Sequence, residues 1–208
     1  MAMPSASPVS IAIMAKAPIP GAAKTRLIPS IGAHAAAVLQ ERLTERAAIT
    51  ALAADIGPVT LWCTPDLAHG SFQNLAARVP IVLKQQPDGD LGIRMLGAIA
   101  AMQGSVLVIG SDCPALTRDH LRTAAATLND SDVVLIPAED GGYVLIGARA
   151  AYPEVFSGIA WGTASVLQET RARISSLGLK SADLPALWDL DTEADLARFE
   201  QMFPELAL

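Results

Sequence analysis

Short apolar segments recur along this 208-residue chain, each bounded by glycine, proline or aspartate. They are continuous runs rich in valine, isoleucine or leucine, which is the composition of strands that are buried on both faces of a sheet. Strands are therefore predicted over five ranges: Val9–Ala15, Val59–Cys63, Ile81–Leu83, Val106–Ile109 and Val133–Ile136.

The segments between these runs carry apolar residues at helical spacing. Helices are predicted over Ala33–Ala54, Leu91–Met102 and Arg118–Leu128, and Thr117 is a suitable N-cap for the third. Alternation of strand and helix predicts an α/β fold with a mainly parallel central sheet flanked by helices. Ligands bind beyond the carboxyl ends of such strands, so the loops that follow strands are the places to look for chemistry.

Composition is that of a globular protein, with 51% hydrophobic and only 4% aromatic residues. No low-complexity linker and no internal repeat divides the chain. We therefore expect a flexible tail over residues 1–8 and a single domain over residues 9–208.

Charge and cysteine content exclude several classes of protein. The formal net charge of −6 argues against a nucleic-acid partner, because nucleic-acid-binding domains are usually basic. The two cysteines, Cys63 and Cys113, are too few for a disulfide framework and lack metal-ligand spacing. No basic leader and no apolar run long enough to span a membrane is present, so we expect a cytoplasmic protein.

The loop after the first predicted strand, "AKAPIPGAAKTRL", concentrates positive charge in an acidic protein. Pro20 and Gly21 shape the loop, while Lys16, Lys24 and Arg26 have no use in a turn as such. A P-loop needs glycine directly before its lysine, and Ala23 stands there instead. With its exposed amides and three cations, the loop is predicted to cradle a di- or triphosphate. The alternative is a solvated basic turn.

Two further loops carry carboxylates. In "VLVIGSDCPAL", Asp112 follows a buried strand, where a carboxylate suits Mg²⁺ or Mn²⁺; the alternative is a turn-forming or capping aspartate. In "WDLDT", Asp189 and Asp191 lie two apart, so an extended backbone points both to one side. The alternative is that Asp191 or Thr192 caps a final helix, which would leave Asp189 unexplained.

Two glycine-containing stretches complete the candidates. "PDGDLGIRM" places Asp90 at a helix start with Arg94 one turn later, and we expect both to contribute to nucleotide binding. "PAEDGGYVLIG" places Asp140 and two glycines before a short strand. An ordinary β-turn explains this second stretch as well as a substrate-binding loop does.

Taken in order, "KAPIPGAAKTRL", "GDLGIRM", "GSDCPAL", "DGGYVLIG" and "DLDT" resemble the bacterial radical-SAM/selenodomain-associated family of candidate glycosyltransferases. The resemblance spans residues 11 to about 199. It implies a glycosyltransferase-A, or nucleotide-diphospho-sugar transferase, fold. The family is similar to 2-phospho-lactate guanylyltransferase and, more distantly, to molybdenum-cofactor guanylyltransferase.

The resemblance also implies roles for matching residues. The loop from Lys16 to Arg26 would hold the nucleotide's phosphates, with Lys24 and Arg26 acting in catalysis together with Asp112. A metal ion, Mg²⁺ or Mn²⁺, would bind Asp112, Asp189 and Asp191, although "GSDC" offers one aspartate where relatives can have a D-x-D motif. A second-substrate pocket would be lined by Asp140, Gly141, Gly142, Tyr143 and Trp161.

Three functions compete at this point. The first is a metal-dependent glycosyltransferase that uses a nucleotide-diphospho-sugar donor and a small-molecule acceptor. The second is a guanylyltransferase-like nucleotidyltransferase, which joins a nucleoside triphosphate to a phosphate- or carboxylate-bearing acceptor and releases pyrophosphate. The third is a nucleotide-binding module without catalysis, which the acidic groups argue against. The base, the acceptor and the oligomeric state stay open.

Overall fold

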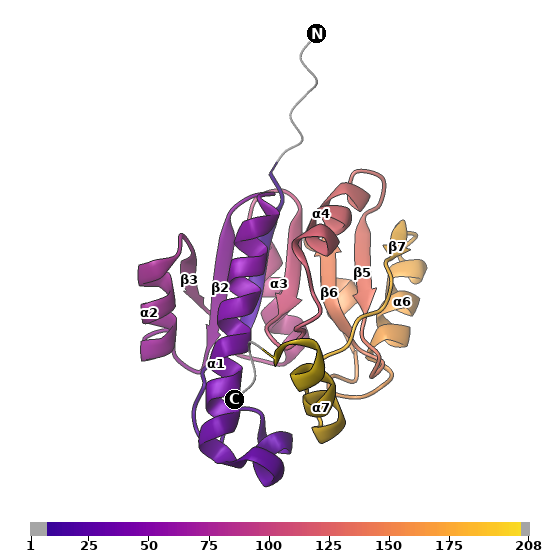
Figure 1. Cartoon of the computed structure of the whole chain (residues 1–208). Helices are drawn as coiled ribbons and strands as arrows, with labels where there is room; N and C mark the ends of the chain where they lie inside the picture. The colour runs from indigo at the N-terminus through magenta and orange to yellow at the C-terminus, as the bar shows by residue number, and fades with distance from the viewer. Residues whose placement is uncertain (1–7, 205–208) are drawn as a thin grey trace.

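The computed structural model describes residues 8–204, and the residues of the predicted tail that precede Pro8 lie outside that range. One twisted sheet runs through the chain (Figure 1). Its strands are β1 (Ser10–Lys16), β2 (Val59–Thr64), β3 (Val82–Gln85), β4 (Val106–Gly110), β5 (Val133–Pro137), β6 (Tyr143–Ala148) and β7 (Ser181–Asp183).

The sheet has the order β3-β2-β1-β4-β6-β5-β7. Every pairing is parallel except the two made by β6, which runs antiparallel to β4 and β5. The predicted α/β fold with a mainly parallel sheet is confirmed. Strands β1 and β4 are central neighbours, so the loops that follow Lys16 and Gly110 leave the sheet side by side at one edge.

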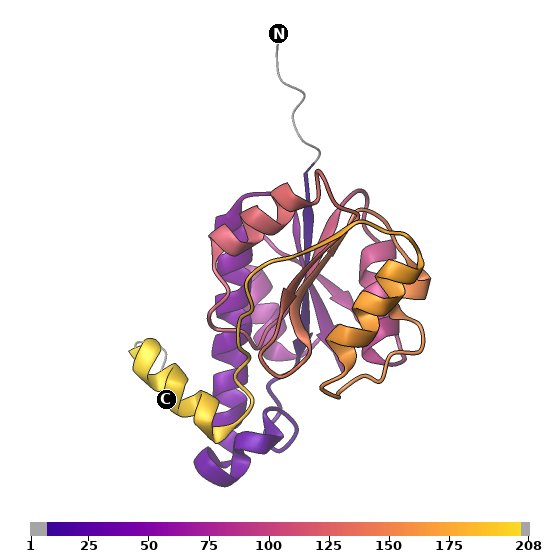
Figure 2. The same ribbon diagram turned by 90° about the vertical axis from the view of Figure 1, so that its right-hand side faces the viewer.

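Helices cover both faces of the sheet (Figures 1 and 2). One face packs against α1 (Ile28–Ala54), α2 (Gly70–Arg78) and α4 (Arg118–Thr127). The other packs against α3 (Leu91–Ala100), α5 (Pro153–Phe156) and α6 (Val166–Ser176). The central strands serve both faces: Ile11 and Ile13 of β1 point to the first, and Ala12 to the second. This two-sided burial explains why their sequences are continuously apolar.

A smaller third cluster lies beyond the edge of the sheet, where α7 (Glu193–Met202) packs beside the first part of α1 (Figure 2). It consists of Leu27, Leu39, Leu43, Trp188, Leu190, Leu196 and Phe199. Because Leu27 and Leu190 are both fully buried in this cluster, it holds the loop after β1 against the segment that precedes α7.

The predicted elements are present with shifted ends. Helix α1 begins at Ile28 rather than Ala33, and Gly32, with φ of 80°, interrupts it near the start. Thr117 caps α4 as expected. Strand β7 and helices α2, α5 and α6 were not predicted, because their segments are short or mostly polar. Among residues 8–204, no helix combines the length and apolar character needed to cross a membrane.

Candidate functional site

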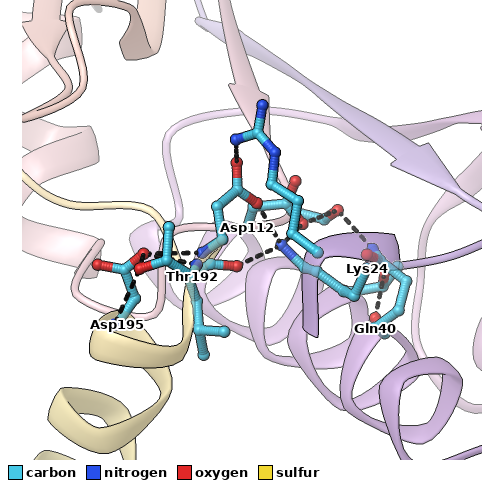
Figure 3. A network of polar contacts seen from close by, with 10 residues as sticks. Lys24, Gln40, Asp112, Thr192 and Asp195 are labelled. Atoms are coloured by element: carbon cyan, nitrogen blue, oxygen red, sulfur yellow. Dashed lines mark hydrogen bonds and ion pairs between the residues drawn. The ribbon is translucent and has the colours of Figure 1, made fainter. Parts of the chain in front are cut away.

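Lys24 is the centre of the site. The loop after β1 turns at Gly21 (φ 84°) and places Lys24 itself in the left-handed conformation (φ 46°, ψ 46°). Its side chain is only 3% exposed, and the ammonium lies 2.9 Å from Asp112 Oδ1 and 3.2 Å from Asp191 Oδ1 (Figure 3). It also donates to the carbonyl oxygen of Leu190 at 2.7 Å. Lys24 thus ties together three loops that lie far apart in the sequence.

The surroundings of Lys24 favour its charged form. Burial opposes the charged form, but the carboxylates of Asp112 and Asp191 outweigh it and raise the pKa of Lys24 above its ordinary value. The group therefore carries a full positive charge at neutral pH. Lys24 and Asp112 thus lie together at one edge of the sheet, where the loops that follow parallel strands meet.

Other cations surround a cavity of about 380 Å³ above the ends of β1 and β2. Lys16 is exposed at the end of β1, and Arg26, with its side chain 71% exposed, lies 3.7 Å from Asp191 Oδ2. Arg94 reaches the cavity from α3 and is fixed by Gly89 O at 2.9 Å and by the side chains of Thr64 and Gln86. With Lys24, four cations line this basic cavity within the part of the chain that the structure describes.

Some residues predicted to bind the nucleotide have other roles. Asp90 is the N-cap of α3, where its carboxylate accepts the N–H of Ile93 at 2.9 Å. Pro20 and Gly21 are exposed and do not line this cavity, so they shape the loop. The amides of Ala22 and Ala23 donate to Ile19 O within the loop. The expectation of exposed amides is thus wrong for these two, and side chains dominate the cradle.

The acidic residues do gather, as a cluster around Lys24. Burial, together with repulsion from Asp112, Asp140 and Asp191, raises the pKa of Asp189 to about 7 against the opposing effect of the Lys24 cation. The capping alternative for Asp191 is wrong. Thr192 is the N-cap of α7, in a reciprocal capping box with Asp195, so the carboxylate of Asp191 is left to face the cations.

A divalent cation fits the chemistry of this cluster but not its present arrangement. Among residues 8–204, no three side chains of metal-ligating type are positioned to hold a metal ion, because the ammonium of Lys24 lies between Asp112 and Asp191. Burial and repulsion from neighbouring carboxylates raise the pKa of Asp189, so a cation beside it would favour its charged form. Oxygen ligands of this kind suit Mg²⁺ or Mn²⁺. The metal therefore stays a prediction.

A second cavity, of about 440 Å³, adjoins the first over the ends of β4 and β6. Asp140, Gly142, Tyr143 and Trp161 line it, together with Asp189 and Asp191. Gly141 does not: its φ is 94°, and a Cβ there would lie 2.3 Å from Ala164 O, so the glycine is required by the backbone. Asp140 also forms the expected turn, accepting the N–H of Gly142 at 2.9 Å. Turn and cavity lining therefore coexist in this segment.

Two buried amides near the site were not found from the sequence. Gln40 of α1 donates to Ser111 Oγ at 3.0 Å, directly beside Asp112. Gln86 donates to the carbonyls of Ala15 and Trp62 and accepts from Arg94. Both line the basic cavity. Glutamine is common on protein surfaces, so no local signal distinguishes these two from exposed ones.

The raised pKa of Asp189 predicts a pH-dependent stability. The folded state holds this proton up to about pH 7, whereas the unfolded chain releases it near 3.8. The folded state thus binds more protons in that window, and its stability falls as the pH rises through it. We expect Asp189→Asn to raise Tm at pH 8 but not at pH 4. Each kcal/mol that the variant gains in unfolding free energy raises Tm by ~2–4 °C. Thermal denaturation without metal, with Asp130→Asn as the surface control, measures this. An equal shift at both pH values would contradict it.

Similar proteins were found among solved structures. A candidate nucleotide-diphospho-sugar transferase from Desulfovibrio desulfuricans is 27% identical, with a TM-score of 0.82 over 98% of this chain and 100% of that one. A Methanothermobacter nucleotidyl transferase has 13% identity and a TM-score of 0.65, over 96% and 99% of the two chains. The 4-diphosphocytidyl-2C-methyl-D-erythritol synthase of Anaerococcus prevotii has 10% identity and a TM-score of 0.63, over 95% and 99%.

These neighbours are transferases, and the fold that they share with this chain is consistent with an enzyme of the transferase class. The predicted nucleotide-diphospho-sugar transferase fold is confirmed. Among families, the profile described as "Uncharacterized protein conserved in bacteria (DUF2064)" matches residues 47–163. No curated protein sequence matches the chain.

Proposed function

Because this chain belongs to the DUF2064 family and has the fold of nucleotide-diphospho-sugar transferases, we propose that it is a metal-dependent glycosyltransferase. It would use a nucleotide-diphospho-sugar donor and a small-molecule acceptor. The observation that carries the proposal is the ammonium of Lys24, buried between Asp112 and Asp191 at a cavity that three further cations line. The association with radical-SAM proteins and the cytoplasmic location stay predictions.

The donor's diphosphate is assigned to the basic cavity. Lys24, Arg26 and Arg94 supply fixed positive charge there, and charge-assisted hydrogen bonds to phosphate are strong. The donor's sugar then extends toward the second cavity, which shares Arg26, Leu91 and Asp191 with the first. A ligand spanning both cavities places its anomeric carbon near their boundary.

Transfer follows from this placement. An acceptor hydroxyl in the second cavity attacks the anomeric carbon, and its proton passes to a carboxylate of that cavity. The bond to the diphosphate oxygen breaks, and the nucleoside diphosphate leaves with the electron pair. Lys24 and Arg26 stabilise the negative charge that develops on the leaving oxygen. Asp112, Asp189 and Asp191 would hold a metal ion, which would add Lewis-acid stabilisation of the same phosphates.

A nucleotidyltransferase is the second candidate. It is supported by the basic lining, which suits a triphosphate, and by the neighbours named as nucleotidyl transferases. In that reaction an acceptor oxygen attacks the α-phosphorus and pyrophosphate leaves. Both candidates use the same basic cavity for phosphate.

Nucleotide binding is the first test of the proposal. We expect a nucleoside diphosphate or nucleotide-sugar to raise the melting temperature in the presence of Mg²⁺ or Mn²⁺. A ligand that binds only the folded state adds about 2.7 kcal/mol of stability at a hundredfold excess over Kd. A thermal-shift screen of nucleotides, with inorganic phosphate as the control, measures this. No stabilisation by any nucleotide, with or without metal, would contradict the proposed function.

A further inference from the structure

The two cavities differ in charge. Two carboxylates, Asp112 and Asp191, face the four cations of the basic cavity, and Lys24 pairs with both. The second cavity reverses this balance: within the described residues, its lining carries the carboxylates of Asp140, Asp189 and Asp191 and the single cation of Arg26. Arg26 also belongs to the basic cavity, where phosphate would compete for it.

Asp140 is a carboxylate of the second cavity without an ion-pair partner among the described residues. It is exposed, it lines the cavity, and the N–H of Gly142, bonded to Oδ1 at 2.9 Å, fixes its orientation. No lysine or arginine of residues 8–204 forms an ion pair with it. Its neighbour Glu139 differs, because it pairs with Arg198 at 2.9 Å and does not line this cavity.

Part of the lining of the second cavity is apolar. Trp161 packs closely on the start of α3, where a Cβ on Gly92 would lie 2.5 Å from Cζ2 of the indole. Glycine at this helical position therefore admits the ring. The remaining apolar side chains of the wall include Met14, Met95, Val108, Val144 and Val166.

We propose that the acceptor is a small molecule with an apolar or aromatic body and a hydroxyl or amine group, and without a phosphate or carboxylate. The body lies against Trp161, and the polar group faces Asp140. An anionic acceptor would meet the carboxylate of Asp140 at short range, where like charges repel. This inference rests on the proposed function only in assigning the donor to the basic cavity. It also opposes the anionic acceptor of the nucleotidyltransferase alternative.

Three probes with one indole ring and different charges test the proposal. Tryptamine is cationic, tryptophol is neutral and indole-3-propionate is anionic. With a saturating nucleoside diphosphate and Mg²⁺ present, ligand-observed NMR measures their affinities. We expect tryptamine to bind about tenfold more tightly than indole-3-propionate, with tryptophol between them, since one close charge pair at a wet site contributes about 1 kcal/mol or more.

Three variants locate the effect. Asp140→Asn keeps the oxygen that accepts the Gly142 N–H but removes the charge. The gap in affinity between tryptamine and indole-3-propionate should therefore narrow severalfold. Glu139→Gln, the matched control, should leave that gap unchanged. Gly92→Ala should weaken all three probes alike by displacing Trp161, without loss of fold.

Two results would overturn the proposal: indole-3-propionate binding as tightly as tryptamine, or an unchanged gap in Asp140→Asn. Absence of binding by all three probes would overturn it too, because the apolar wall would then recognise no aromatic body. If the nucleoside diphosphate itself fails to bind in the same samples, that result counts against the proposed function and not against the acceptor proposal.

Discussion

Replacing Lys24 with methionine should lower kcat/KM about 10²–10³-fold with the nucleotide that stabilises the wild-type protein, as loss of one preorganised charge at a transition state does elsewhere. Methionine retains most of the aliphatic stem of Lys24, whose side chain is only 3% exposed. Asp112 and Asp191 are more than 40% exposed, so their carboxylates stay hydrated after the lysine is lost. Stability should therefore fall only by the contribution of the lost contacts, about 1–3 kcal/mol.

Steady-state kinetics and thermal denaturation together measure this expectation. Lys180→Met is the matched control, because Lys180 is an exposed lysine outside both cavities. Wild-type turnover in the Lys24→Met variant would instead support the alternative that the loop after β1 is a solvated basic turn. Loss of fold would instead show that the ammonium serves mainly to join the three loops.

Asp112→Asn should have a comparably large effect. The change keeps the side chain's shape but removes a charge from the cluster around Lys24. We expect turnover to fall by at least about 10²-fold, in the range that loss of one charge-stabilising group costs. Stabilisation of the nucleotide complex by Mg²⁺ or Mn²⁺ should disappear, because the metal would lose one of its oxygen ligands. The fold should persist, since the side chain of Asp112 is 43% exposed.

Thermal shifts with and without metal, at fixed nucleotide concentration, separate these effects. Asp119→Asn is the control: Asp119 is an exposed carboxylate on α4 that pairs only with surface arginines among the described residues. A metal-dependent shift that survives unchanged in Asp112→Asn would remove this residue from the proposed metal site.

The sheet and the central contact of the site could be predicted because both follow from general rules. Runs such as Val106–Ile109 are apolar throughout because the strand is covered on both faces. The carboxyl ends of β1 and β4 share one edge, which brings Lys24 to Asp112. The rule that ligand sites form at the carboxyl ends of parallel strands is sufficient for that expectation.

Other features depend on contacts between distant segments. The sequence around Gly92 predicts an ordinary helix residue and gives no sign that Trp161, far along the chain, packs on it. Gln40 and Gln86 acquire their roles from partners on other elements. The local sequence pattern does not identify such distant partners.

Product identity tests the central claim most directly. Purified protein, incubated with a nucleotide-diphospho-sugar that stabilises it, Mg²⁺ and an acceptor of the neutral or cationic class, should release free nucleoside diphosphate only when acceptor is present. Separation of nucleotides by anion-exchange chromatography, with the Lys24→Met variant alongside, measures this. Acceptor-dependent nucleoside diphosphate in the wild type and little in the variant is the predicted result. Unchanged nucleotide, or equal release by both proteins, would contradict a glycosyltransferase that works through Lys24.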